Sequence, residues 1–167
     1  KLGLTMEETA EYTADYLELQ TRLGRSQRMT DAQLSAGVAN TVLEIDKLAR
    51  VTGKRRDQIM EEMKDNMADK RLKLIFNTME DSAQRNLNGV LTMMDSASPD
   101  LKDAITEMVA TGGVPLNAMG QDLIRLNPNL AKMSAGLKDG SVSQEEFMAE
   151  IRKTCLLYTS DAADEAD

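Results

Sequence analysis

The sequence predicts an all-α fold, and three observations support this. Apolar residues recur at spacings of three and four along most of the chain, as they do on one face of a helix. Capping signals precede these runs, and glycine or proline follows most of them. No segment shows a convincing two-residue alternation, which a half-buried strand would need. We therefore expect seven or eight helices, joined by short loops that contain glycine or proline.

Capping boxes predict the starts of the first two helices. The letters TMEE at residues 5–8 fit such a box, so a helix should run to about Leu23 and end at Gly24. The letters TDAQ at residues 30–33 fit a second box, and Gly53 is well placed to end that helix. Its apolar face is expected to comprise Leu34, Val38, Val42, Ile45 and Ala49.

A long helical stretch should follow, from about Arg55 to Met79, with a bend marked by Asp65 and Asn66. Its apolar stripe is Ile59, Met63, Met67, Leu72, Ile75 and Met79. The next helix carries Ala83, Leu87, Val90 and Met94. Another starts at Ser98 as the N-cap, because Pro99 suits the first helical position.

The strongest break in the chain is TGGVPLN, at residues 111–117, where two glycines and a proline must leave the helical path. We therefore divide the chain into a helical region, 1–110, and a short-helix region, 111–154. Two short helices should end before Pro128 and at Gly140. The last helix begins at Ser143, where SQEE fits another capping box.

Composition excludes several kinds of catalytic site. The chain has no histidine, which removes Ser-His and Cys-His catalysis, di-iron motifs and ordinary zinc sites. No phosphate loop, dinucleotide fingerprint or nucleophile elbow appears. The sequence has no run of 18 apolar residues, so it predicts no membrane span. We expect no catalytic, metal or cofactor site in this chain, and no enzyme activity. Twelve methionines and few aromatic residues predict a malleable helical core.

Two acidic patterns could bind a hard cation. Glu7, Glu11, Asp15 and Glu18 line one helical face, but a solvated face is favoured because nothing in the sequence converges on it. The second pattern is LKDGSVSQEEF, residues 137–147, which resembles the second half of a calcium-binding loop. Only Asp139 and Glu146 would offer carboxylates at the usual positions. A turn followed by a capped helix is therefore the favoured interpretation.

The letters LARVTGKRRDQIMEEM, residues 48–63, resemble a DNA-binding helix–turn–helix. The small, turn and apolar positions of that motif are Ala49, Gly53 and Ile59. The candidate nucleic-acid residues are Lys54, Arg55 and Arg56, near the start of the second helix. Glu replacements of Arg55 and Arg56 should abolish DNA binding if the chain is a DNA-binding module, and should leave packing nearly intact if its role is structural.

Other features of this stretch favour a plain helix pair with a glycine turn. Lys54 and Glu62 occupy positions that the DNA-binding motif usually makes apolar. The acidic residues that follow would repel phosphate: Glu61, Glu62 and Asp65. Nucleic-acid binding is therefore the alternative function and not the first.

Several stretches resemble tail tape-measure proteins of tailed bacteriophages, chiefly environmental ones. They are YLELQTRLGRSQRMTDAQL, EIDKLARVTGKRRDQIMEEM and GGVPLNAMGQDLIRLNPNLAKMSAGLKDGSVSQEEFMAEI. LARVTGKRRDQI is similar to a recurring phrase, L-A-R-x-T-G-x-S-R, with Arg55 where serine is common. The resemblance covers most of residues 12–151 and includes no invariant chemical signature.

The resemblance implies a phage virion structural protein, a fragment that contributes to tail assembly and length determination. Such proteins are made in the bacterial host cytoplasm and packed inside the growing tail. The partners implied are tail tube proteins, assembly chaperones, baseplate proteins and other copies of the chain. The helix breaks predict a compact region here and not an extended rod. An enzyme whose catalytic residues lie outside this sequence is a third hypothesis.

The last residues, 155–167, resemble translated sequencing adapter. CLLYTS can be encoded by TGT CTC TTA TAC ACA TCT, and DAADE by GAC GCT GCC GAC GAN, which together look like a transposon mosaic end used to build shotgun libraries. We therefore expect this tail to be non-native and the chain to be a fragment. The tail carries four acids and no base, so the net charge of −8 becomes −4 for residues 1–154. On its own the tail would be a frayed, acidic terminus.

Overall fold

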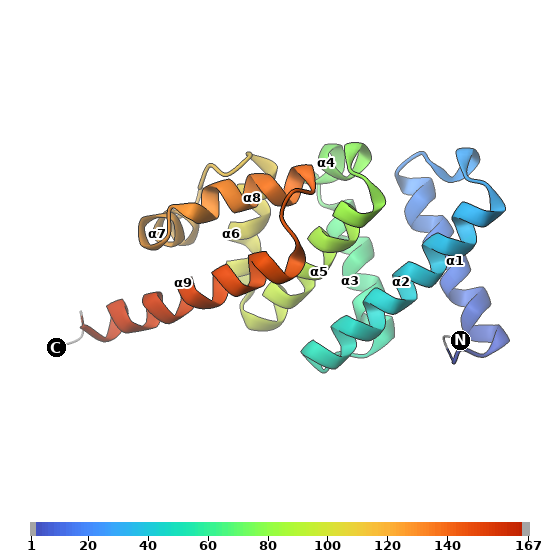
Figure 1. Cartoon of the computed structure of the whole chain (residues 1–167), viewed down its shortest axis with the longest axis horizontal. Coiled ribbons are helices and arrows are strands. Elements are labelled where there is room, and N and C mark those ends of the chain that lie inside the picture. The colour runs from blue at the N-terminus through green and yellow to red at the C-terminus, as the bar shows by residue number, and fades with distance from the viewer. Residues whose placement is uncertain (1–2, 165–167) are drawn as a thin grey trace. The chain divides into compact units, whose positions relative to one another are not determined.

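The computed structural model describes the backbone of residues 3–164 and the side chains as far as Leu157. The described chain contains nine α-helices, one short 3₁₀-helix and no strand, which confirms the all-α prediction (Figure 1). The first four helices are α1 (Met6–Arg22), α2 (Asp31–Thr52), α3 (Arg56–Ala68) and α4 (Lys73–Thr78), with the 3₁₀-helix η1 at Ser26–Arg28. The other five are α5 (Asp81–Ala97), α6 (Pro99–Ala110), α7 (Ala118–Leu126), α8 (Asn129–Asp139) and α9 (Gln144–Asp164).

The predicted caps are confirmed as hydrogen bonds. In α1 the Glu8 amide donates to the Thr5 hydroxyl over 3.1 Å, and the Thr5 amide donates to the Glu8 carboxylate over 2.8 Å. The same reciprocal pair starts α2, and Ser98 caps α6. These starts depend only on residues within one turn, which is why the sequence shows them.

The expected long helix from Arg55 to Met79 is wrong, because the structure has two helices there. The bend expected at Asp65 and Asn66 lies inside α3, and the break comes at Asp69. Asp69 leaves the helical conformation, with ψ of 124°, and its carboxylate accepts a hydrogen bond from the Arg71 amide over 2.8 Å. This local side-chain bond competes with the next helical turn. The split also explains why there are nine helices and not eight.

The chain forms two compact units, residues 1–81 and residues 82–167. In the first unit α1 packs on α2 and on α3, α2 packs on α3, and α3 contacts α4. In the second unit α6 contacts α7 and α8, and α9 contacts the same two helices. The division expected at residue 111 therefore lies within the second unit, where the glycine break is a turn between two helices that share one core.

The core of the first unit is centred on apolar residues of α2 and α3. Val42, Ile45 and Leu48 of α2 are fully buried, as is Ile59 of α3. The buried methionines of the chain are Met60, Met63, Met67, Met79, Met94 and Met108. The expectation that methionine supplies much of the core is confirmed. Flexible thioether side chains are suited to filling irregular gaps between packed helices.

The last helix, α9, continues as far as Asp164, so the backbone of the adapter-like segment is helical up to that residue. Cys155 is partly buried, and this burial raises the pKa of its thiol. The non-native origin of the segment stays a prediction. Within the described residues, no helix is both long enough and apolar enough to cross a membrane.

Candidate functional site

The best candidate site from the sequence is the corner between α2 and α3. Leu48 is fully buried at the end of α2, and Gly53 ends that helix in a left-handed conformation, with φ of 71°. The Gly53 amide still donates to the Ala49 carbonyl over 2.9 Å. Arg55 then has an extended backbone, and α3 starts at Arg56. The predicted glycine turn between two helices is therefore confirmed.

Each of the three candidate nucleic-acid residues lies beside a carboxylate of the same unit. The Lys54 ammonium is 2.5 Å from the Glu62 carboxylate, and Arg55 makes a two-pronged contact with Asp57 at 3.1 and 2.9 Å. Nε of Arg56 is 2.6 Å from the Asp46 carboxylate. A phosphate would have to compete with these intramolecular partners. The positive charge predicted from the sequence is thus largely compensated where it stands.

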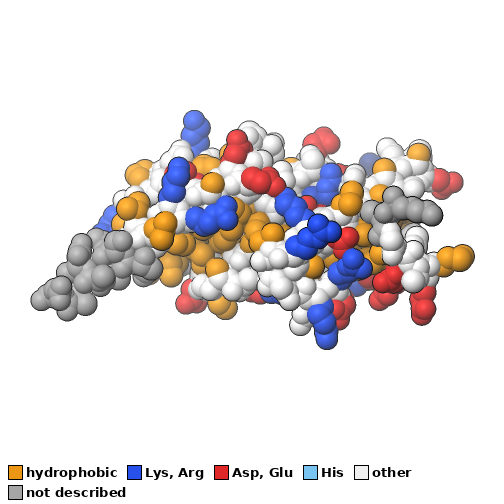
Figure 2. All heavy atoms as spheres, turned by 60° about the horizontal axis from the view of Figure 1, so that its bottom comes forward, with side chains coloured by type: hydrophobic (Ala, Val, Ile, Leu, Met, Phe, Trp, Pro, Cys, Tyr) orange, Lys and Arg blue, Asp and Glu red, His pale blue; other side chains and the backbone are white. Residues whose placement is uncertain are grey.

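The pairing of Lys54 with Glu62 explains a departure from the helix–turn–helix pattern. Both residues stand where that motif usually places apolar side chains, and here they form a partly buried ion pair between the turn and α3. Basic side chains also stand among acidic and uncharged ones on the face shown in Figure 2. The arrangement suits a helix corner stabilised by local charge pairs.

Residue 55 is the N-cap of α3, and arginine fills that position poorly. The Arg55 amide donates to the Gln58 side chain over 3.1 Å, which is one half of a capping box. The other half needs a side-chain oxygen at residue 55, and a guanidinium has no acceptor. Serine is common at this position of the tape-measure phrase, and serine would supply that oxygen.

Replacing Arg55 with Ser is therefore expected to stabilise the first unit by about 0.5 to 1 kcal/mol. A serine N-cap contributes about 1 kcal/mol, whereas the lost contact with Asp57 is exposed and contributes a few tenths. Thermal unfolding should show a melting temperature a few degrees higher. Arg55→Ala is the matched control, because it removes the same contact without adding an acceptor. Equal melting temperatures for the two variants would contradict the capping argument.

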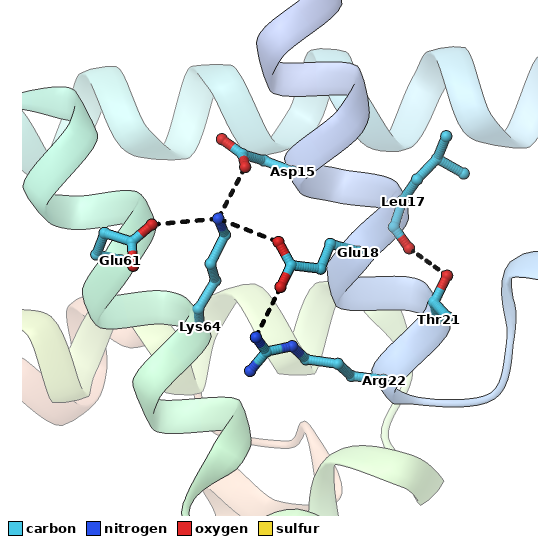
Figure 3. A network of polar contacts seen from close by, with 7 residues as sticks. All are labelled: Asp15, Leu17, Glu18, Thr21, Arg22, Glu61 and Lys64. Atoms are coloured by element: carbon cyan, nitrogen blue, oxygen red, sulfur yellow. Dashed lines mark hydrogen bonds and ion pairs between the residues drawn. The ribbon is translucent and has the colours of Figure 1, made fainter.

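A second polar cluster joins α1 to α3 around Lys64 (Figure 3). The Lys64 ammonium is 2.8 Å from Asp15, 3.2 Å from Glu61 and 3.3 Å from Glu18. Glu18 also accepts a hydrogen bond from Arg22 over 2.7 Å. Two of the four acidic residues predicted to line one face of the first helix therefore face a cation from another helix. The interpretation as a solvated face is wrong for Asp15, which is partly buried, whereas Glu18 stays exposed although it contacts Lys64.

The electrostatics of this cluster favour the charged form of every member whose pKa is shifted. The hydrogen bond to Asp15 is the main cause that raises the pKa of Lys64 above its ordinary value, although burial opposes it. The hydrogen bond from Arg22, followed by that from Lys64, lowers the pKa of Glu18. With one ammonium among three carboxylates from α1 and α3, the cluster is suited to joining the two helices.

Replacing Lys64 with Met is expected to destabilise the first unit by about 1 to 2 kcal/mol at pH 7, between the values for exposed and buried pairs. The Lys64 side chain is only 13% exposed, and its removal leaves Asp15, Glu18 and Glu61 facing one another. Urea unfolding measures the change. Lys73→Met, at an exposed position of α4, is the control and should have little effect.

The pH dependence gives a second test of the same cluster. Because the folded pKa of Glu18 is lowered, its contribution is present above the ordinary value of 4.5 and is lost as the pH falls. Because the folded pKa of Lys64 is raised, its contribution is present below the ordinary value of 10.5 and is lost as the pH rises above it. The Lys64→Met variant should therefore lose less stability than the parent chain, both as the pH falls below 4.5 and as it rises above 10.5. Parallel pH profiles would count against the cluster.

The calcium-loop pattern has a local explanation in the structure. The Asp139 carboxylate accepts a hydrogen bond from the Ser141 amide over 2.8 Å, and hydrogen bonding with Ser141 lowers the pKa of Asp139. The Glu146 carboxylate accepts from the Ser143 amide over 2.8 Å, as the start of α9 requires. These two carboxylates are used in a turn and a cap. Among the described residues, no group of three or more potential ligands is placed to hold a metal ion.

Two polar contacts were missed by sequence reasoning. Asn127 follows α7, and its amide donates to Glu150 over 2.7 Å and to Thr154 over 3.0 Å, so it joins the end of α7 to α9. The hydrogen bond from Asn127 is the main cause that lowers the pKa of Glu150. Arg25, between α1 and α2, contacts the end of α4. No short-range signal could find either one, because the partners lie 23 to 56 residues away.

Surface hollows add little chemistry to these clusters. A groove of about 690 Å³ lies along α1 and the start of α2 and includes Leu4, Thr9, Leu34 and Val38. The Thr9 hydroxyl donates to the Thr5 carbonyl of its own helix over 2.8 Å. A smaller hollow of about 480 Å³ between α1 and α3 is bordered by Glu8, Glu11, Tyr12, Asp15, Arg56, Asp57, Met60 and Glu61.

Comparison with protein-family models, with curated proteins and with solved structures gives no match for this chain.

Proposed function

We propose that the chain is a segment of a phage virion structural protein, a tail tape-measure protein that contributes to tail assembly and length determination. The proposal rests on the sequence resemblance together with one structural observation. The phrase LARVTGKRRDQI forms the corner between α2 and α3, and the residue that is commonly serine occupies the N-cap of α3. A phrase whose pattern is that of a helix end, a glycine turn and a helix start suits a structural role.

The ion pairs of the first unit support the same role. Arg56 joins α3 to Asp46 of α2, Lys54 joins the turn to Glu62 of α3, and Lys64 joins α3 to Asp15 of α1. The helix pairs that share the most contacts each lie within one unit of about eighty residues. Helices that pack together are therefore near one another in the sequence. Compact helical units in series suit a long scaffold chain. The partners proposed are tail tube proteins, assembly chaperones, baseplate proteins and other copies of the chain, in a virion assembled in the host cytoplasm.

Mass spectrometry of purified virions tests the location. Trypsin should release LNPNLAK, residues 126–132, and DGSVSQEEFMAEIR, residues 139–152. When particles from the source sample are separated in a density gradient, both peptides should co-purify with tailed particles. The amount of each peptide should rise and fall across the fractions with the amount of tail tube peptides. Their absence from particle fractions that contain tube peptides would overturn the proposal. Long-read sequencing of the locus would in addition show whether an extended helical reading frame lies among tail genes.

An in-frame deletion tests the role in length determination. Removing residues 1–81 from the parent gene should shorten the tail, by less than the about 120 Å that a continuous helix of this length would span, because these residues form a compact unit. Electron microscopy of the particles measures the length. Tails of unchanged length would show that the proposed role in length determination is wrong. The proposed location in the virion would not be affected, because the peptides test it separately.

DNA binding is the alternative function, and one observation favours it. Arg55 is 73% exposed at the start of α3, where a recognition helix would meet bases. Glu at both positions would not leave packing intact, contrary to the expectation from sequence, because a carboxylate at residue 56 would face Asp46. Arg55→Gln with Arg56→Gln is the better variant, and Lys70→Gln with Lys73→Gln is the control.

Fluorescence anisotropy with a random 25-base-pair duplex, at 50 and 200 mM salt, separates the two functions. The tape-measure proposal expects weak binding that both double variants lower equally. Binding lost only in the Arg55 and Arg56 variant, with a smaller salt slope, would support DNA recognition.

A further inference from the structure

Arg25 makes the longest-range polar contacts of the first unit. One guanidinium nitrogen donates to the Asn77 carbonyl over 2.9 Å and to the Met79 carbonyl over 2.7 Å. The other lies 3.3 Å from the Asp81 carboxylate. These acceptors are the end of α4 and the residues that follow it, and Asp81 is the last residue of the first unit. Arg25 therefore holds the segment by which the chain leaves that unit.

The end of α1 aims Arg25 toward these acceptors. Gly24 takes the left-handed conformation, with φ of 70°, and the Arg25 amide donates to the Gln20 carbonyl over 2.9 Å. The Gly24 amide donates to the Thr21 carbonyl over 2.9 Å, which completes a Schellman motif. The backbone of Arg25 is thus fixed by α1 itself. Its side chain is 29% exposed and spans from this fixed point to α4.

The segment that Arg25 holds has weak local support. Helix α4 has six residues, which is too short for a stable isolated helix. The turn at Asp69 separates it from α3, so α4 does not share the helical hydrogen bonds of α3. The Met79 amide donates to the Ile75 and Phe76 carbonyls, and the guanidinium supplies donors to the Asn77 and Met79 carbonyls at this end of the helix. Burial of Leu72, Ile75, Phe76 and Met79 also attaches the segment to the core.

We propose that Arg25 is a latch that controls local opening of α4 and the exit segment, residues 73–81, while α1, α2 and α3 stay folded. With the latch closed, the connection to the next unit starts at the surface of the first. With the latch open, the released residues add about 30 Å of extended chain to that connection. The latch would set how far the chain can lengthen before a unit unfolds. This inference concerns the first unit alone and holds whichever function is correct.

Hydrogen exchange of the intact chain, followed by mass spectrometry, tests the latch. In Arg25→Met, the amides of residues 73–80 should exchange about 10- to 30-fold faster, whereas amides of α2 should change less than twofold. Arg25→Lys should open almost as much as Arg25→Met, because an ammonium cannot reproduce the planar fork of donors. Arg28→Met is the matched control, since Arg28 is exposed on the same loop and should have no effect.

Asp81→Asn separates the ion pair from the carbonyl contacts. Asp81 is 53% exposed and its contact is the longest of the three, so this variant should speed exchange by less than threefold. Three results would each overturn the latch: unchanged exchange of residues 73–80 in Arg25→Met, equal acceleration in α2, or wild-type exchange in Arg25→Lys. Equal acceleration in α2 would mean that Arg25 stabilises the unit as a whole.

Discussion

Replacing Gly113 with alanine is expected to destabilise the second unit by about 3 kcal/mol or more. Gly113 has φ of 107°, a backbone conformation that residues with a Cβ atom rarely adopt. A Cβ there would also lie 2.9 Å from the Ala131 carbonyl carbon, and closer still to its oxygen. That carbonyl belongs to the backbone of α8 and cannot rotate aside as a side chain could. Relief would require α8 to move away from the turn, at a cost typical of overpacking plus backbone strain.

Gly112→Ala is the matched control for this prediction. Gly112 also has a left-handed backbone, with φ of 72°, but a Cβ there would meet nothing within 4 Å. Its replacement should cost only about 1 to 2 kcal/mol, the ordinary penalty of that conformation. Urea unfolding of both variants measures the difference. Equal costs would show that backbone conformation alone decides the effect and that α8 yields to the added atom.

The two glycines illustrate what the sequence could and could not predict. The sequence indicated that TGGVPLN must break the helical path, and it does so between α6 and α7. It could not indicate that the turn lies against α8, because that contact joins residues eighteen positions apart. For the same reason residue 111, where the sequence suggests a boundary, lies within the second compact unit. A break in local conformation need not divide a core when the flanking helices pack together.

Signals within one helical turn were predicted well, and contacts between helices were not. The capping boxes at Thr5 and Thr30 were correct because donor and acceptor lie three residues apart. The break at Asp69 was missed, since an aspartate in a polar stretch is compatible with both a helix and a turn. The carboxylates around Lys64 come from two helices, and only their packing brings Asp15 within reach of the ammonium.

The same limit applies to the candidate site. The sequence identified Lys54, Arg55 and Arg56 as a charged group near a helix start, and the structure places all three at that corner. Their partners decide the chemistry, however, and one of them, Asp46, lies on the preceding helix. Composition and spacing show which residues could act. Which charges are already compensated depends on the packing of α2 against α3.

Gly37→Ala is the other substitution with a large expected effect, and here the sequence predicts the opposite sign. Gly37 lies within α2, where alanine is about 1 kcal/mol more favourable than glycine. In the structure the ring of Tyr16 occupies the space of the missing side chain: a Cβ would lie 2.6 Å from Cε1, and closer to the ring carbon and hydroxyl beyond it. Tyr16 is only 5% exposed, so the ring has little room to move. We expect the variant to lose about 2 to 3 kcal/mol.

A double-mutant cycle with Tyr16→Leu isolates this contact. Leucine lacks the outer ring atoms that would meet the added Cβ, so in the Leu background Gly37→Ala should become neutral or stabilising by up to about 1 kcal/mol. Tyr16→Phe keeps the ring and should leave most of the cost in place. The sign of the Gly37→Ala effect in the two backgrounds therefore decides the matter. A cost that persists with leucine would place the strain in the backbone of α2, whereas a reversal would show that close packing of Tyr16 on Gly37 sets the distance between α1 and α2.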